Sequence, residues 1–132
     1  MEFILAPIIG FIDYLVTFNI CEAFTTQKVS DIKKYGIESM YEKAFAIAAN
    51  GTNGIHISYD LDCIDCNLAP GVSVPVKNGI NLEEAYGFVD YIIKNKEKIK
   101  SIDLVEYNPL KDKNKITEKI ATNILNTLIE NI

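Results

Sequence analysis

The stretch "HISYDLDCIDCNLAPGVSVP", residues 56–75, decides the fold, because an alternating apolar run ends there in closely spaced acidic residues and a Pro-Gly turn. From Ile55 to Asp62, isoleucine, tyrosine and leucine alternate with polar residues, which predicts a β-strand. Side chains two residues apart share one face of a strand, so the carboxylates of Asp60 and Asp62 are expected to converge at its carboxyl end. In open α/β sheets this is the end at which ligands bind.

The segments around this strand predict alternating helices and strands. Apolar residues at helical spacing predict a helix that starts near residue 31 and stops at the turn sequence 50–54. Asn81, followed three residues later by Glu84, resembles a capping box and predicts a helix to about Lys96. A short β-rich run at 101–109 and an amphipathic helix at 116–129 follow. The order helix, strand, helix, strand, helix predicts a parallel α/β topology.

Composition narrows the class of protein. A chain of 132 residues, 48% of them hydrophobic, is long enough for one modest core. Its net charge of −5 is spread along the sequence, which argues against nucleic acid as a partner. Three cysteines and no recognisable leader favour the cytoplasm. The apolar segment 3–20 is interrupted by Pro7, Gly10 and Asp13, so we expect a buried strand or packing segment and no membrane span.

The two aspartates at the strand end have two interpretations. Like charges held this close repel each other unless a cation lies between them or one of them is protonated. Oxygen-rich sites of this kind suit Mg²⁺, Ca²⁺ or Mn²⁺. Alternatively, Asp60 and Asp62 only cap the turn that follows the strand.

Two motifs resemble those of the ureohydrolase family, which includes arginase, agmatinase and formimidoylglutamase. Residues 58–75, "SYDLDCIDCNLAPGVSVP", are similar to a family strand ending S-F-D-x-D-x-x-D-P followed by A-P-G-x-S/G-x-P. Residues 103–117, "DLVEYNPLKDKNKIT", resemble the family's strand ending E-x-N-P and its closing helix. The resemblance implies an arginase-like three-layer α/β fold with a mostly parallel sheet, of which residues 19–132 form the C-terminal part. Residues 1–18 show no family pattern.

The resemblance also implies roles for three acidic residues. Asp60 and Asp62 correspond to ligands of a binuclear manganese centre, and Glu106 to the residue that pairs with a guanidine or amidine substrate. Two metal ions can activate water near neutral pH, and a carboxylate can hold a planar N–C–N cation with paired hydrogen bonds. For Glu106 the alternative is an ordinary carboxylate at a strand end. No catalytic residue is assigned.

Other polar residues of the motif are expected to be structural. We expect Asp65 to form a turn by accepting hydrogen bonds from nearby backbone N–H groups. His56, the only histidine, is expected to be hydrogen-bonded within the fold rather than a metal ligand. Cys66 replaces the family's proline and forms a C-x-x-C pair with Cys63. That pair is interpreted as two partly buried thiols, with a redox or zinc site as the alternative.

The chain departs from the family in lacking its histidine and D-x-H-x-D ligands, so we expect a truncated or split ureohydrolase. Alone it should be inactive, and it is expected to need a separate N-terminal half or to form a homo-oligomer. "APGVSVP" and "EYNP" favour formimidoylglutamase, which gives glutamate and formamide, with arginase or agmatinase as alternatives. Two other classes stay open: an inactive remnant or interaction module, and a thiol-disulfide protein.

Overall fold

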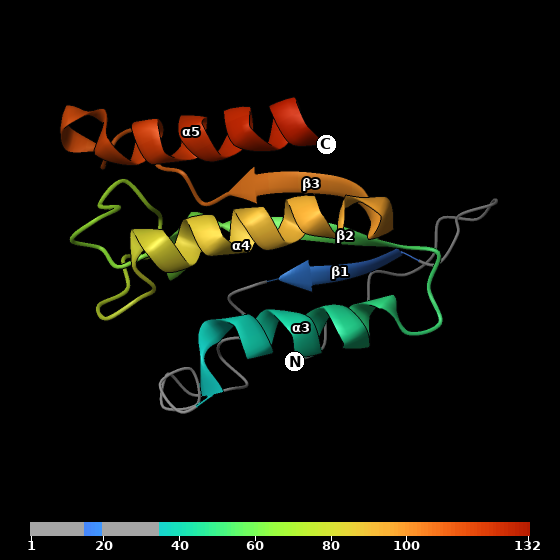
Figure 1. Ribbon diagram of the computed structural model, residues 1–132. Coiled ribbons are helices and arrows are strands. Elements are labelled where there is room, and N and C mark those ends of the chain that lie inside the picture. Colours follow the sequence, from blue (N-terminus) through green and yellow to red (C-terminus); the bar gives the residue numbers. More distant parts are fainter. Residues whose placement is uncertain (1–14, 20–34) are drawn as a thin grey trace.

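Three parallel strands form the sheet of the computed structural model, which describes residues 15–19 and 35–132. The strands are β1 (Leu15–Asn19), β2 (Gly54–Asp60) and β3 (Ile99–Val105), in the order β1-β2-β3. The central strand β2 pairs in parallel with both neighbours. Their carboxyl ends therefore lie at one edge of the sheet (Figure 1), and the predicted parallel α/β class is confirmed.

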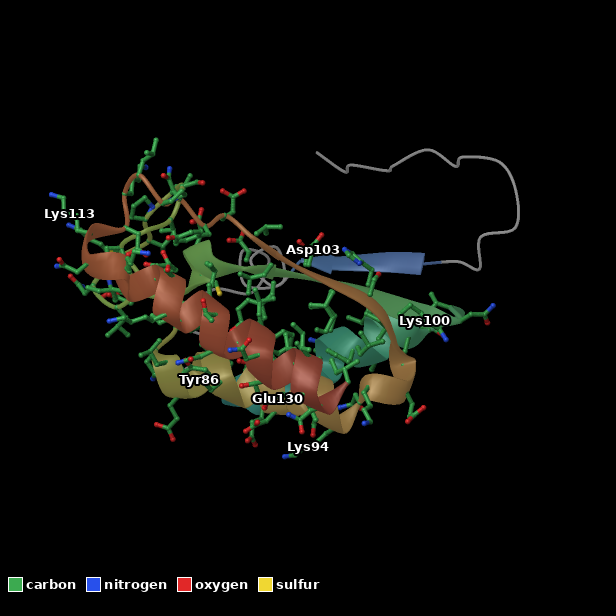
Figure 2. All side chains as sticks on the ribbon, turned by 90° about the horizontal axis from the view of Figure 1, so that it is seen from above. Tyr86, Lys94, Lys100, Asp103, Lys113 and Glu130 are labelled. Carbon is green, nitrogen blue, oxygen red and sulfur yellow. The ribbon has the colours of Figure 1, made fainter. Side chains whose placement is uncertain are left out.

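Helices α3 (Ile37–Ala49), α4 (Leu82–Lys94) and α5 (Ile116–Asn131) connect and follow the strands. Figures 1 and 2 show all three on the same side of the sheet. Short 3₁₀ turns lie at η1 (Leu61–Cys63), η2 (Lys96–Lys98) and η3 (Lys113–Lys115). The described part of the chain thus supplies the sheet and one helical layer of the expected three-layer fold. Within that part, no helix is both long and apolar enough to cross a membrane.

Strand β2 buries its apolar face against the helices, as the alternation in the sequence predicts. Ile55, Ile57 and Tyr59 are fully buried, while His56 and Ser58 on the other face are partly exposed. The Tyr59 hydroxyl donates to the Ala85 carbonyl of α4 at 2.9 Å, so this buried polar group is satisfied. The strand at the centre of the sheet is therefore fixed against α4, which also fixes where its acidic end lies.

Helix α4 begins with the predicted capping box. The Asn81 side chain accepts from the Glu84 N–H at 2.9 Å, and the Glu84 carboxylate accepts from the Asn81 N–H at 2.8 Å. Two N–H groups that the helix leaves free are thereby satisfied. The helix ends at Lys94, two residues before the predicted Lys96. The expected start of α3 near residue 31 lies outside the described residues.

The two sequence motifs differ from prediction in how their strands end. Strand β2 stops at Asp60, and Asp62 lies in the turn η1, so the alternation of a strand does not extend to it. Strand β3 covers Ile99–Val105, not 101–109. It ends because Glu106 adopts a left-handed backbone with φ 68°, which breaks the extended conformation.

Candidate metal site at the carboxyl end of the sheet

Asp60 closes strand β2 and also caps the turn that follows it. One of its carboxylate oxygens, Oδ1, accepts the Asp62 N–H at 2.8 Å, and Asp60 is the residue that precedes η1. The expected turn cap is therefore present at Asp60. The capping hydrogen bond uses one of the two carboxylate oxygens of Asp60, so capping does not by itself exclude a metal-binding role for Asp60.

Asp62 has a buried carboxylate with one unpaired oxygen. Oδ2 accepts the Val74 N–H at 3.0 Å, whereas Oδ1 is buried and has no hydrogen-bond partner. Burial raises the pKa of Asp62, and the negative charges of Asp60 and Glu106 raise it further, against the lowering effect of the Val74 N–H. An unpaired buried acceptor is costly, and a cation between these carboxylates would satisfy it.

The acidic residues present are of the right type to bind a divalent cation, but there are too few of them to complete a site. Carboxylate oxygens suit Mn²⁺. Across the described ranges, however, no group of three or more histidine, cysteine, aspartate or glutamate side chains is arranged to hold a metal ion. Asp60 and Asp62 cannot complete two centres that each take about six ligands. The chain can therefore hold part of such a site.

Glu106 follows β3 directly, at the same sheet edge as Asp60 and Asp62. Its side chain is exposed, and its backbone carbonyl accepts the Ser73 N–H at 3.1 Å. Its charge contributes to the raised pKa of Asp62, so the two carboxylates lie within electrostatic range. The structure thus brings together the three acidic residues that the motifs single out.

The loop that carries the A-P-G sequence packs closely against the start of α5. The Gly71 N–H donates to the Thr117 hydroxyl at 2.8 Å, and the Gly71 carbonyl accepts from the Asn108 N–H at 2.9 Å. A side chain at Gly71 would not fit, because its Cβ would lie 2.8 Å from the Cα of Asp112. Glycine is therefore required where two backbone segments meet.

The sequence did not predict the backbone N–H groups of the A-P-G loop that donate hydrogen bonds to Asp62 and Glu106. Val74 donates its N–H to the Asp62 carboxylate, and Ser73 donates its N–H to the backbone carbonyl of Glu106. Thr117 is fully buried and holds the loop that carries both residues. A backbone N–H donor cannot be recognised from the type of residue that carries it. The A-P-G turn and the threonine at the start of the last helix were the sequence features that could have indicated a loop held close to the site.

His56 and Asp65 have the contacts expected of structural residues. His56 Nδ1 lies 2.7 Å from the Ser101 hydroxyl, and Nε2 lies 3.4 Å from the Asp103 carboxylate. Figure 2 shows Asp103 on the face of the sheet away from the helices. The Asp65 carboxylate accepts the Asn67 N–H at 2.8 Å, and such bonds hold its pKa below the ordinary value. The hydrogen bonds expected of His56 and Asp65 are therefore confirmed.

The two cysteines of the C-x-x-C pair are free thiols. Cys63 is buried and its thiol donates to the Asp60 carbonyl at 2.9 Å, whereas Cys66 is partly exposed. Neither cysteine belongs to a cluster that could hold a metal within the part of the chain that the structure describes. Burial limits the access of other thiols to Cys63, which favours the structural interpretation over the redox one.

Comparison with known proteins finds similar sequences and structures. The sequence pattern of the arginase family matches residues 13–130. Arginase from Brevibacillus brevis is 31% identical over 98 residues, which make up 74% of this chain and 33% of that protein. The crystal structure of arginase from Bacillus subtilis superposes with a TM-score of 0.68 at 31% identity, covering 76% of this chain and 34% of that one.

Formimidoylglutamase from Bacillus subtilis superposes with a TM-score of 0.69 at 24% identity, over 77% of this chain and 32% of that one. At that identity the similarity concerns the fold alone. The chain spans about a third of the length of the relatives that it matches. Because the family pattern covers residues 13–130, including the strand ends that carry the acidic residues, the chain belongs to the arginase family.

Proposed function

We propose that this chain contributes Asp60 and Asp62 to a manganese centre that hydrolyses a C–N bond at a guanidino carbon. The observation that carries the proposal is the buried, unpaired Oδ1 of Asp62, with Asp60 and Glu106 close enough to raise its pKa. A divalent ion would supply the missing partner for this oxygen. Membership of the arginase family supports manganese as that ion.

Two of the acidic residues would bind metal, and the third would bind substrate. Two bound manganese ions would supply an activated water and polarise the carbon that it attacks. Asp60 would hold the ions from the end of β2, and Asp62 from the turn η1 that follows it. Glu106 would bind the planar cationic group of the substrate from the end of β3, through paired charge-assisted hydrogen bonds. Its exposed side chain leaves it free to do so.

Arginine becomes the favoured substrate in place of formimidoylglutamate. The motif comparison favoured formimidoylglutamase, but the curated relatives at 31% and 33% identity from Brevibacillus brevis and Staphylococcus aureus are both arginases. Formimidoylglutamate and agmatine are the alternatives. The remaining metal ligands would come from polypeptide outside these 132 residues, whether a separate N-terminal half or a neighbouring chain.

The test is an enzyme rebuilt by joining residues 15–132 to the N-terminal part of Brevibacillus brevis arginase. We expect manganese-dependent release of urea from arginine, and loss of both metal and rate in Asp60→Ala and Asp62→Ala. Asp90→Asn, which changes an exposed carboxylate of α4, is the matched control and should keep both. Full manganese occupancy in both alanine variants would contradict the ligand assignment.

Glu106→Gln in the same enzyme separates substrate binding from metal binding. It should retain both metal ions and lose kcat/KM by a factor that corresponds to about 1.5–3 kcal/mol, because one charge-assisted contact is removed. Arginine, agmatine and formimidoylglutamate should be compared side by side. If kcat/KM for the best of the three substrates is unchanged in Glu106→Gln, Glu106 is an ordinary carboxylate at the sheet edge with no role in substrate binding.

A further inference from the structure

A single peptide group connects Asp62 to a lysine of the next motif. The Val74 N–H donates to Asp62 Oδ2 at 3.0 Å, and the Ser73 carbonyl accepts from Lys111 Nζ at 2.7 Å. The Ser73 carbonyl and the Val74 N–H belong to the same peptide bond. This peptide therefore lies between an ammonium group at one end and a carboxylate at the other.

Ser73, which supplies the carbonyl of this peptide, is also held from the side of β3. The Ser73 N–H donates to the Glu106 carbonyl at 3.1 Å, so both backbone groups of Ser73 are used. Lys111 itself follows a tight turn, in which its N–H donates to the Asn108 carbonyl at 3.1 Å. The position of the ammonium group is thus set by backbone contacts close to the end of β3, although its side chain is exposed.

The ammonium group should strengthen the contact with the aspartate. A charged donor on a peptide carbonyl polarises the peptide bond, and hydrogen bonds in series reinforce each other. The Val74 N–H thereby becomes a better donor to Asp62 Oδ2. Since Oδ2 is held, the carboxylate cannot rotate freely, and Oδ1 remains the unpaired oxygen. The orientation of Asp62 is therefore set in part by a side chain that does not touch it.

We propose that Lys111 is a positioning residue that acts through the Ser73–Val74 peptide to hold the Asp62 carboxylate with Oδ1 available to a cation. Only the last step, the binding of a cation by Oδ1, rests on the proposed function. The bridge from Lys111 to Asp62 is a property of the chain in the absence of metal, so it can be tested separately.

The first test follows the Val74 amide by NMR in the 132-residue chain without metal. In Lys111→Met its proton signal should move upfield and its hydrogen exchange should accelerate about fivefold, the factor for a hydrogen bond of about 1 kcal/mol. Lys111→Arg keeps a donor and should restore both values. Lys113→Met is the matched control, because Lys113 makes only a backbone hydrogen bond in the structure and points outward in Figure 2.

An unchanged Val74 amide in Lys111→Met, in a variant whose other signals match the wild type, would overturn the proposal. The second test measures by electron paramagnetic resonance how tightly Mn²⁺ binds each variant of the rebuilt enzyme, in which residues 15–132 are joined to the N-terminal part of Brevibacillus brevis arginase. We expect Lys111→Met to weaken binding about fivefold, Lys111→Arg to restore it, and Lys113→Met to leave it unchanged. Equal affinity in Lys111→Met would refute the positioning role. If the wild type binds no Mn²⁺ at Asp62, the proposed function fails while the amide result still decides whether the bridge exists.

Discussion

Replacing Thr117 by valine should destabilise the chain through one buried hydrogen bond. Thr117 is fully buried and its hydroxyl accepts the Gly71 N–H at 2.8 Å. Valine has nearly the same shape, so the substitution leaves the packing and removes only the acceptor. The buried Gly71 N–H then has no partner, which costs about 1–3 kcal/mol. The free energy of unfolding should fall by that amount.

Thr127→Val provides the control on the same helix. The Thr127 hydroxyl donates to the Asn123 carbonyl at 2.8 Å on the exposed side of α5. Water can replace that bond, so its loss should change stability by no more than about 0.5 kcal/mol. Urea unfolding followed by circular dichroism measures both variants. With a urea dependence of about 1–3 kcal/mol per molar, Thr117→Val should lower the midpoint by roughly 1 M. Equal midpoints for the two variants would refute the reasoning.

Two further predictions concern pH and the acidic residues. Burial alone would raise the pKa of Asp112, but the N–H groups of Glu118 and Thr117 outweigh it and the pKa is lowered. Asp112 therefore stabilises the fold above the ordinary carboxyl pKa of about 4 and loses this effect as pH falls through its own lower pKa. Asp112→Asn should be less stable than wild type at pH 7, and urea titrations should show the difference shrinking in acid; a constant difference would contradict this. The pKa of Asp62 is raised by burial and by neighbouring carboxylates, so its ionisation destabilises the metal-free fold as pH rises. Asp62→Asn should be more stable than wild type at pH 7 without metal, a gain that disappears in acid, and a loss of stability at pH 7 would contradict it.

Local signals in the sequence predicted the elements that local chemistry determines. The Asn81 capping box fixed the start of α4, and the alternation around Ile57 predicted the buried face of β2. These features depend on residues a few positions apart, whose side chains meet in a helix turn or along a strand. Parallel topology followed from the order of the elements, and the structure confirms it.

The site was less predictable because it depends on backbone geometry. The rule that residues two apart share a face assumes a strand that continues, whereas the Asp60 side chain caps a turn and takes Asp62 out of the strand. From a distant loop, the Ser73 N–H contacts the Glu106 backbone carbonyl and the Val74 N–H contacts the Asp62 carboxylate. Any residue except proline could supply such donors. Lys111, 38 positions from Ser73, gave no signal of its role.

The most direct test of the central claim measures where Mn²⁺ binds this chain. Paramagnetic Mn²⁺, added in small amounts to the isotope-labelled protein, broadens the amide signals of residues near the ion even when binding is weak. We expect broadening to centre on residues 60–63 and 73–74, and to disappear from them in the Asp60→Asn, Asp62→Asn double variant. Broadening that centres elsewhere, or that is the same in the double variant, would contradict a manganese site at these aspartates.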